Sequence, residues 1–252
     1  MQILVSDVDR HIICFGSNSL GESTVNPLLV RWSDTESATA WTPTAINQAG
    51  GVLLSQGSTI IGAIQTRQEI LIWTDAGITS MRFVGAPFIY SFTEVASGPS
   101  LISPNAAVSA NNKVFFMDRG GFYVYAGSVQ RLPCTVLDHV FSDINLSQQF
   151  KSFGAPIEGA NEVIWFYPSK DSTEVNRYVS YNYLENVWAI GTTDDGFTRT
   201  AWIEALSLDY PLAAGKTANS DTNYLYNQEK GHSNDGSDFS AYIESSDFDL
   251  NP

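Results

Sequence analysis

IIGAIQTRQEILIWTDAGITSMRFV, residues Ile60–Val84, is the stretch of sequence that determines the fold. It contains three short runs rich in apolar, β-branched and aromatic residues. Thr66-Arg67-Gln68 and Asp75-Ala76-Gly77 separate these runs and have the composition of turns. No stripe of apolar residues at helical spacing fits them, so the stretch predicts an antiparallel meander of three strands. The predicted strands are Ile60–Ile64, Glu69–Thr74 and Ile78–Val84.

The same order of small strand, polar turn, aromatic strand, turn and strand recurs along the chain. Further copies are Ala106–Tyr125, Phe153–Tyr183 and a weaker Leu212–Tyr226. The matching positions Trp73, Met117, Phe166 and Tyr226 are 44, 49 and 60 residues apart. A four-stranded propeller blade takes roughly 40–50 residues, so the first two spacings fit and the third implies an insertion. Repeated meanders favour radial packing of small sheets.

We therefore predict an all-β fold, a β-propeller-like array of antiparallel meander sheets, in a single domain over 1–252 or part of such a domain. Its blade-like units are expected at roughly 1–50, 51–100, 101–145, 146–198 and 199–252. The first and last units are expected to be incomplete, because Gln2–Val5 and His11–Phe15 are typical of the middle of a blade. Ala86–Pro104, with three prolines, is interpreted as a connector. Helical spacing appears only in Cys134–Lys151, which predicts at most one short helix near 136–150.

Composition limits the functional classes. The formal net charge of the 252 residues is −14 and the pI about 4.4, with only 13 Lys and Arg residues. This charge argues against a protein that holds nucleic acid through its phosphates. Asp7, Asp9 and Arg10 stand where a signal peptide needs an apolar core, and no apolar run approaches the roughly 20 residues of a membrane span. We expect a soluble protein, made in the cytoplasm, without a membrane anchor.

Cysteine and histidine offer little chemistry. Cys14 and Cys134 are interpreted as buried free thiols, with one disulfide as the alternative. His11, His139 and His232 are far apart, and no HExxH or CxxC spacing occurs. GxSxG and P-loop motifs are also absent from the sequence.

Two turn and loop features invite a functional interpretation. Trp73–Thr79 superficially resembles the Asp-box turn of sialidase propellers, but its usual first Ser is missing. We interpret it as a blade turn in which Asp75 bonds its own backbone. Trp41 is interpreted as a cap on a sheet edge, with an exposed binding Trp as the alternative.

Candidate acids for a glycosidase are Asp194, Asp195 and Glu94, although solvated loop carboxylates explain them as well. The oxygen-rich segments Asn219–Asn223 and Asn234–Asp238 lack the ligand order of a calcium loop. We therefore assign no catalytic, cofactor-binding or metal-binding residue, and expect no cofactor.

Several stretches together resemble the tail-nozzle proteins of short-tailed phages, also called tail tubular proteins B. The resemblance covers nearly the whole chain in order, and its most specific parts are WTPT, IQTRQEIL, GSVQRLPCTV and RYVSYNYLENVW. The stretches that carry it are Asn26–Gly50, Ile60–Pro87, Ser103–Met117, Phe122–Val136, Glu162–Gly191 and Tyr242–Leu250.

The resemblance implies a structural virion protein, a propeller-bearing subunit that assembles six to a ring beneath the portal and adaptor proteins. Such a ring continues the channel for genome ejection, adjoins tail fibres or spikes, and lets DNA pass without specific binding. Family members are longer on both sides of this region, so the resemblance implies that the chain corresponds to the propeller portion. No catalytic residue is carried over.

Two other functions stay open. One is a glycan-binding or glycan-hydrolysing propeller, for which two carboxylates about 5–10 Å apart over an aromatic-lined pocket would argue. An axis filled by small residues such as Gly62, Ala63 and Ala107 would favour the structural role instead. The third is a cytosolic protein-interaction propeller.

Overall fold

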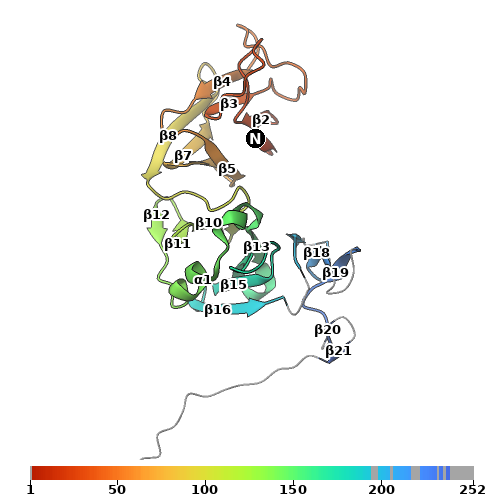
Figure 1. The fold of residues 1–252 in the computed structure, drawn as a ribbon. Helices are drawn as coiled ribbons and strands as arrows, with labels where there is room; N and C mark the ends of the chain where they lie inside the picture. Colours follow the sequence, from red (N-terminus) through yellow and green to blue (C-terminus); the bar gives the residue numbers. More distant parts are fainter. Residues whose placement is uncertain are drawn as a thin grey trace, which may run out of the picture.

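The computed structural model describes residues 2–193, 198–204, 207–216, 222–231, 233–234 and 237–238, and in these it is nearly all β. Five antiparallel sheets follow one another along the chain, and neighbouring strands in each sheet are consecutive in sequence (Figure 1). The predicted all-β array of meander sheets is confirmed.

The first two sheets are β1–β4 and β5–β8. Their strands are β1 Gln2–Val5, β2 Ile12–Phe15, β3 Leu29–Trp32, β4 Gly50–Leu53, β5 Ile60–Gln65, β6 Ile70–Thr74, β7 Gly77–Phe83 and β8 Tyr90–Ser97. The third and fourth sheets comprise β9 Ala107–Ala110, β10 Lys113–Asp118, β11 Gly121–Tyr125, β12 Val129–Arg131, β13 Phe153–Ile157, β14 Glu162–Tyr167, β15 Arg177–Asn182 and β16 Val187–Thr192.

The fifth sheet has three strands, and a small hairpin follows it. These strands are β17 Ala201–Ile203, β18 Leu212–Lys216, β19 Asn223–Asn227, β20 Ser233–Asn234 and β21 Ser237–Asp238. One α-helix, α1 Leu137–Asp143, and the 3₁₀-helix η1 Leu146–Lys151 lie where the single short helix is expected. A second 3₁₀ turn, η2, spans Glu158–Ala160.

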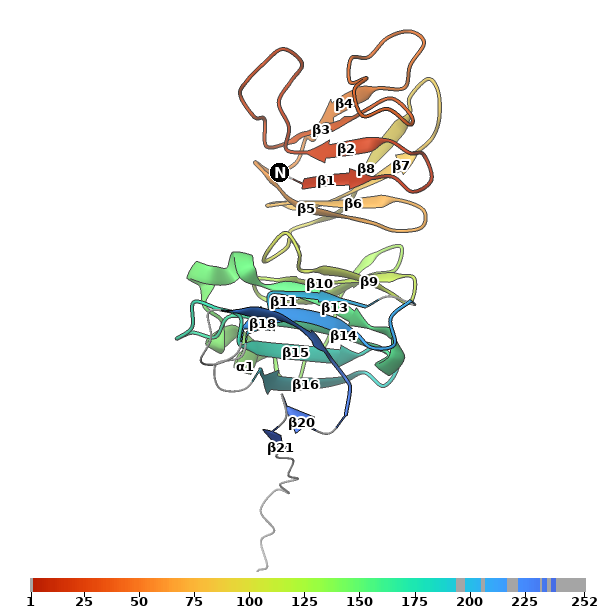
Figure 2. The same ribbon diagram turned by 90° about the vertical axis from the view of Figure 1, so that its right-hand side faces the viewer.

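The sheets stack in chain order along an arc, with the first sheet at one end and the fifth at the other (Figure 1), and Figure 2 shows the first two sheets stacked above the third and fourth. The first strands of successive sheets contact one another, β1 with β5, β5 with β9, β9 with β13, and β13 with β17. Contact through first strands is the arrangement of blades around a propeller axis. Small residues allow the close approach: a Cβ on buried Gly62 of β5 would lie 2.7 Å from the Pro104 carbonyl oxygen.

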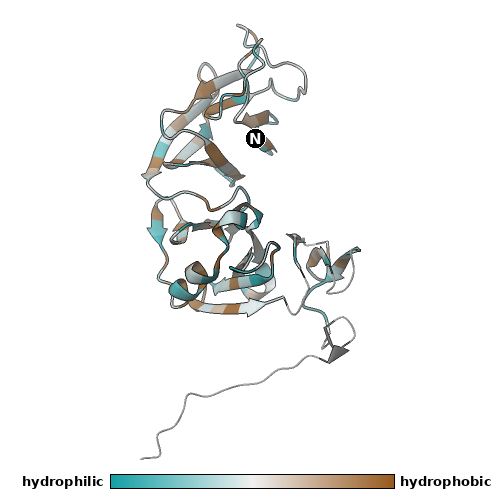
Figure 3. Cartoon of the chain, viewed as in Figure 1, coloured by the Kyte–Doolittle hydropathy of each residue, from teal (hydrophilic) through white to brown (hydrophobic). Residues whose placement is uncertain are grey.

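The cores lie between the sheets, because alternate residues of a strand point to opposite faces. All five residues of β6 are buried. Ile70 and Ile72 pack into the core shared with the first sheet, whereas Leu71 and Trp73 pack into the core of the second, third and fourth sheets. Figure 3 shows the strongly hydrophobic residues concentrated on such strands. An apolar run without polar alternation is therefore a strand covered on both faces.

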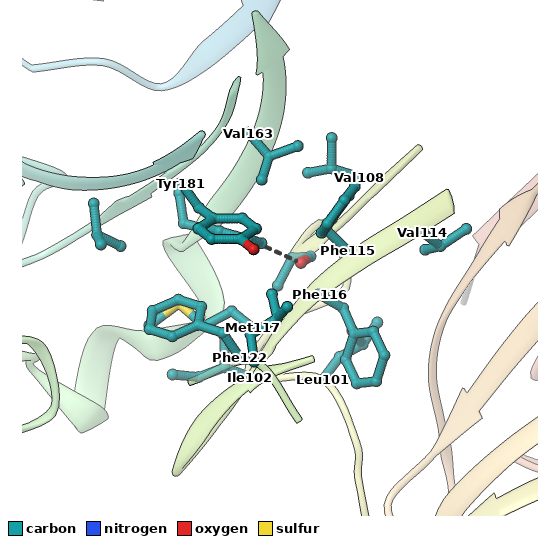
Figure 4. Packing of buried hydrophobic residues seen from close by; sticks show 14 of the residues in the cluster. Leu101, Ile102, Val108, Val114, Phe115, Phe116, Met117, Phe122, Val163 and Tyr181 are labelled. Atoms are coloured by element: carbon teal, nitrogen blue, oxygen red, sulfur yellow. Dashed lines mark hydrogen bonds between the residues drawn. The ribbon is translucent and has the colours of Figure 1, made fainter. Parts of the chain in front are cut away.

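The third sheet is covered in the same way. Figure 4 shows Phe115, Phe116 and Met117 of β10, with Val163 and Tyr181 of the fourth sheet nearby. The fourth sheet joins its neighbours through both faces. The indole N–H of Trp165 donates to the Ala106 carbonyl at 3.0 Å, and on the other face Phe166 contacts Trp202 of β17.

The two end sheets each leave one face bearing exposed apolar side chains. On the first sheet these are Ile3, Val5 and Leu53, each more than half exposed, and on the fifth sheet Ile203 and Leu225. The register places Ile3 beside Cys14 and Val5 beside Ile12, so this apolar face continues across β1 and β2.

Three sequence expectations are wrong. The first unit is not incomplete, because β1 and β2 are the first two strands of a complete four-stranded sheet, β1–β4. Ala86–Pro104 is not only a connector, because β8 occupies its centre and pairs with β7. The fourth repeat copy is aligned one strand late, because β17 precedes β18 in the fifth sheet.

With that correction the inferred insertion before Tyr226 disappears. The second strands of the last four sheets, β6, β10, β14 and β18, begin 43, 49 and 50 residues apart. All three spacings are close to the roughly 40–50 residues of a blade.

Candidate functional site

An open groove of about 1020 Å³ lies at one end of the second, third and fourth sheets. It is formed mainly by the hairpins between the first and second strands of these sheets, which are Thr66–Glu69, Ala110–Lys113 and Glu158–Asn161. Arg82, Tyr125 and Tyr183 complete its lining from neighbouring strands and turns. We call this feature the interblade groove. Because repeated connections line it, it is a product of the sheet stacking itself.

The Glu69 carboxylate connects two sheets in this groove. It accepts a hydrogen bond from the Tyr125 hydroxyl of the third sheet at 2.6 Å, and from the Arg82 Nε of β7 at 2.9 Å. The Ser80 hydroxyl also donates to it. The Glu69 side chain is only 7% exposed, whereas that of Arg82 is 55% exposed. A largely buried carboxylate thus has a charged partner and two hydroxyl donors, which compensate its desolvation.

These contacts set the protonation of the network. Burial raises the pKa of Glu69, but the hydrogen bonds from Arg82, Ser80 and Tyr125 outweigh burial, and the net pKa is below the ordinary 4.5. Burial and the hydrogen bond to Glu69 raise the pKa of Tyr125. Glu69 is therefore ionised at neutral pH, and Tyr125 is a neutral donor.

Local hydrogen bonds fix the hairpins that carry the lining residues. The Thr66 hydroxyl accepts from the Glu69 N–H at 3.2 Å and donates to the Glu69 carbonyl at 2.8 Å. In the next hairpin, Asn111 and Asn112 both have positive φ, 49° and 57°. Two successive left-handed residues make the turn type whose twist matches a β-hairpin, and Asn tolerates that conformation.

Two cations of the interblade groove are available to a ligand. The side chains of Arg67 and Lys113 are exposed and form no hydrogen bond or ion pair with any residue that the structure describes. The described carboxylates that line the groove are Glu69 and Glu158, against the cations Arg67, Arg82 and Lys113. The lining of the groove thus carries a positive net charge, although the net charge of the chain is −14.

The sequence-derived candidate acids do not form this site. Glu94 lies on β8, where Gln56 Nε2 and the Ser97 hydroxyl donate to its Oε1, and it does not line the groove. Asp194 and Asp195 lie outside the described residues. Every pair among these three acids therefore includes a residue outside the described part of the chain.

The metal and thiol candidates are dispersed. His11 is fully buried, with its Nδ1 2.7 Å from the Ser33 carbonyl oxygen, and His139 lies on α1. His232 is outside the described residues, as are parts of Asn219–Asn223 and Asn234–Asp238. The described residues contain no group of three or more His, Cys, Asp and Glu placed to hold a metal ion. Cys14 and Cys134 are free thiols but are half-buried, not buried as expected, and this partial burial raises the pKa of each thiol.

Asp75 and Trp41 have structural contacts. The Asp75 carboxylate accepts from the backbone N–H groups of Ser58 and Thr59, so it tethers the preceding connection, a contact that the interpretation of a self-bonded turn missed. Trp41 is half-buried in the β3–β4 connection, and the Arg31 guanidinium of β3 lies 5.7 Å from its ring centre. Because β3 is an inner strand of the first sheet, this contact does not place Trp41 at a sheet edge, and the interpretation as an edge cap stays a prediction.

Sequence reasoning missed the Glu69 network because its members are far apart in the chain. Tyr125 follows Glu69 by 56 residues, and only the stacking of two sheets brings them together. The TRQE segment carries a turn signal but no signal for a partner in the next sheet.

No helix in the described residues is both long and apolar enough to cross a membrane. Comparison with protein-family models gives no match, and comparison with curated protein sequences gives no significant match.

Proposed function

We propose that this chain is a structural virion component, a nozzle subunit in the tail of a short-tailed phage that lines the path of genome ejection. The observation that carries the proposal is where the family-like stretches fall. Ile60–Pro87 covers β5–β7, Ser103–Met117 covers β9 and all but the last residue of β10, and Glu162–Gly191 covers β14, β15 and all but the last residue of β16. The resemblance thus follows the stacked strands, the part of the chain that such a subunit would use as its scaffold.

The packing of the first strands supports a structural role. Gly62 and Ala63 of β5 are buried, and Ala107 of β9 is half-buried. Small residues at these positions bring the sheets together, as expected for a propeller axis filled by protein.

The proposed partners follow from the same role. A ring of six copies needs complementary, non-identical surfaces on each copy, and the exposed apolar faces of the first and fifth sheets are candidates for them. Portal, adaptor and tail-fibre or spike proteins would adjoin the ring. A net charge of −14 suits a wall that duplex DNA passes without binding, because phosphates are held through clustered cations.

The hydrolase alternative has weaker support. A glycosidase needs a carboxylic acid with a raised pKa to protonate the leaving group. Glu69 has the opposite shift, and its carboxylate already accepts three donors. We therefore propose a non-enzymatic protein located in the virion tail and made in the host cytoplasm.

Quantitative mass spectrometry of purified phage particles tests the proposal. The chain should be found in intact particles at a fixed ratio to the other tail proteins, and should remain after washing in high salt. Its absence from washed particles, with abundance in the soluble lysate, would contradict a virion role.

A further inference from the structure

We propose that the interblade groove binds oligosaccharides that carry carboxylate groups. This inference goes beyond a nozzle role, because lining a DNA channel requires no ligand site. It rests on the shape of the groove, on the chemistry of its lining and on two cations whose side chains have no partner among the described residues.

The groove has the dimensions of a binding site for several sugar units. Its volume is about 1020 Å³, at the upper end of the roughly 300–1,000 Å³ of small-molecule pockets. It is open, and its lining comes from three successive sheets, so a chain-like ligand can lie across the hairpins. An extended, partly solvated ligand fits this form better than a compact apolar one.

The lining is suited to sugar hydroxyl groups. Side-chain amides both donate and accept hydrogen bonds, and hydroxyl groups do the same. The amides come from Gln68, Asn111, Asn112 and Asn161, and the hydroxyls include those of Thr66, Ser109 and Tyr183. Asn111 and Asn112 stand on a tight hairpin, which holds their backbones in place before a ligand arrives.

The cations select an acidic saccharide. Arg67 and Lys113 come from different sheets and have no described ion-pair partner. Arg82 forms an ion pair with Glu69. This ion pair is part of the site, and it leaves the charges of Arg67 and Lys113 free for a ligand. A carboxylate on the ligand would pair with a guanidinium or ammonium group, and charge-assisted hydrogen bonds are stronger than neutral ones.

Other anionic ligands fit less well. Nucleic acid binding through phosphates needs several cations in a row, whereas this groove has three, one of which is paired with Glu69. An acidic peptide would place apolar side chains on the protein, but the aliphatic lining is limited to Ala110, Val114, Ala126 and Leu184.

The test is isothermal titration calorimetry of the full chain with trigalacturonate, with maltotriose as the neutral probe. Arg67→Gln combined with Lys113→Gln removes both available cations. The matched control combines Arg119→Gln with Lys170→Gln, two exposed cations that do not line the groove. Both double variants change the net charge equally, and thermal unfolding of each checks that the fold is retained.

We expect saturable binding of trigalacturonate by the wild-type chain, about tenfold weaker for each groove cation removed. The control should bind like wild type, and maltotriose should bind more weakly than trigalacturonate. Absence of trigalacturonate binding, or equal loss in both double variants, would overturn the proposal. Tighter binding of triglutamate or of a DNA duplex than of trigalacturonate would also overturn it, by assigning the groove to a different anion.

Discussion

The Tyr125 hydroxyl lies 2.6 Å from the Glu69 carboxylate, and this hydrogen bond joins β11 of the third sheet to the residue just before β6 in the second. Because the carboxylate is largely buried, losing one donor leaves it with less compensation for desolvation. Tyr125→Phe should lower the free energy of unfolding by about 1–2 kcal/mol, measured in urea. In a double-mutant cycle with Glu69→Gln, the two substitutions should couple by at least about 0.5 kcal/mol. Strict additivity would show that the contact does not link the sheets.

The same carboxylate predicts a pH dependence. The net pKa of Glu69 in the folded protein is below its ordinary value of 4.5. Its stabilising contribution is therefore present above about pH 4.5 and is lost as the pH falls through the folded pKa. The difference in unfolding free energy between wild type and Glu69→Gln should be constant from pH 7 to 5 and shrink towards pH 3. A difference that stays constant down to pH 3 would be evidence against a depressed pKa.

Close contact between first strands can be tested with glycine substitutions. A Cβ at Gly62 would meet the Pro104 carbonyl oxygen at 2.7 Å and the Leu101 Cδ1 at 3.1 Å. Gly62→Ala should destabilise the protein by about 1–3 kcal/mol, because the opposing backbone cannot yield easily. Gly120→Ala is the control, since nothing lies within 4 Å of its Cβ position. Thermal unfolding should distinguish them, and equal midpoints would refute the tight junction.

The charge distribution predicts that duplex DNA does not bind. The chain has 13 Lys and Arg residues against 27 Asp and Glu residues, and the cations are scattered along the sequence. Binding by counterion release needs several phosphates neutralised at once. A gel-shift titration at about 50 mM salt should show no complex. Micromolar binding that weakens steeply with added salt would contradict the proposed non-binding wall.

Light scattering of the purified chain tests its self-association separately. We expect weak association, because the resemblance implies that part of the ring contact belongs to segments beyond the propeller portion. A stable hexamer would show instead that the surfaces of this chain suffice for ring assembly, and the end faces with exposed Ile3 and Leu225 would be the first candidates for the contact.

The strands predicted best are those in which a run of apolar residues indicates that the strand is buried. β5, β6 and β7 lie within one residue of the predicted bounds at each end, because a short apolar run between turn residues leaves few other structures. β8 was missed because Thr93 and Glu94 break its apolar run and prolines stand on both sides. Its strand structure comes from pairing with β7, a contact that local sequence does not specify.

The interblade groove was not predictable in the same way. Each of its hairpins is visible locally as a turn, but their convergence depends on the sheets stacking through their first strands. Glu69 in TRQE and Tyr125 in FYVY each suit their own strand. Only the packed arc shows that one donates to the other and that Arg67 and Lys113 line the same groove.

The most direct test of the proposed virion role is electron microscopy of phage particles labelled with gold-conjugated antibody against this chain. The antibody should be raised against an exposed segment, such as the β3–β4 connection, where Ile46 is 98% exposed. We predict gold at the tail end of intact particles, next to the portal vertex. Labelling spread over the capsid, or confined to soluble lysate with none on particles, would contradict the proposal that this chain is a tail-nozzle subunit.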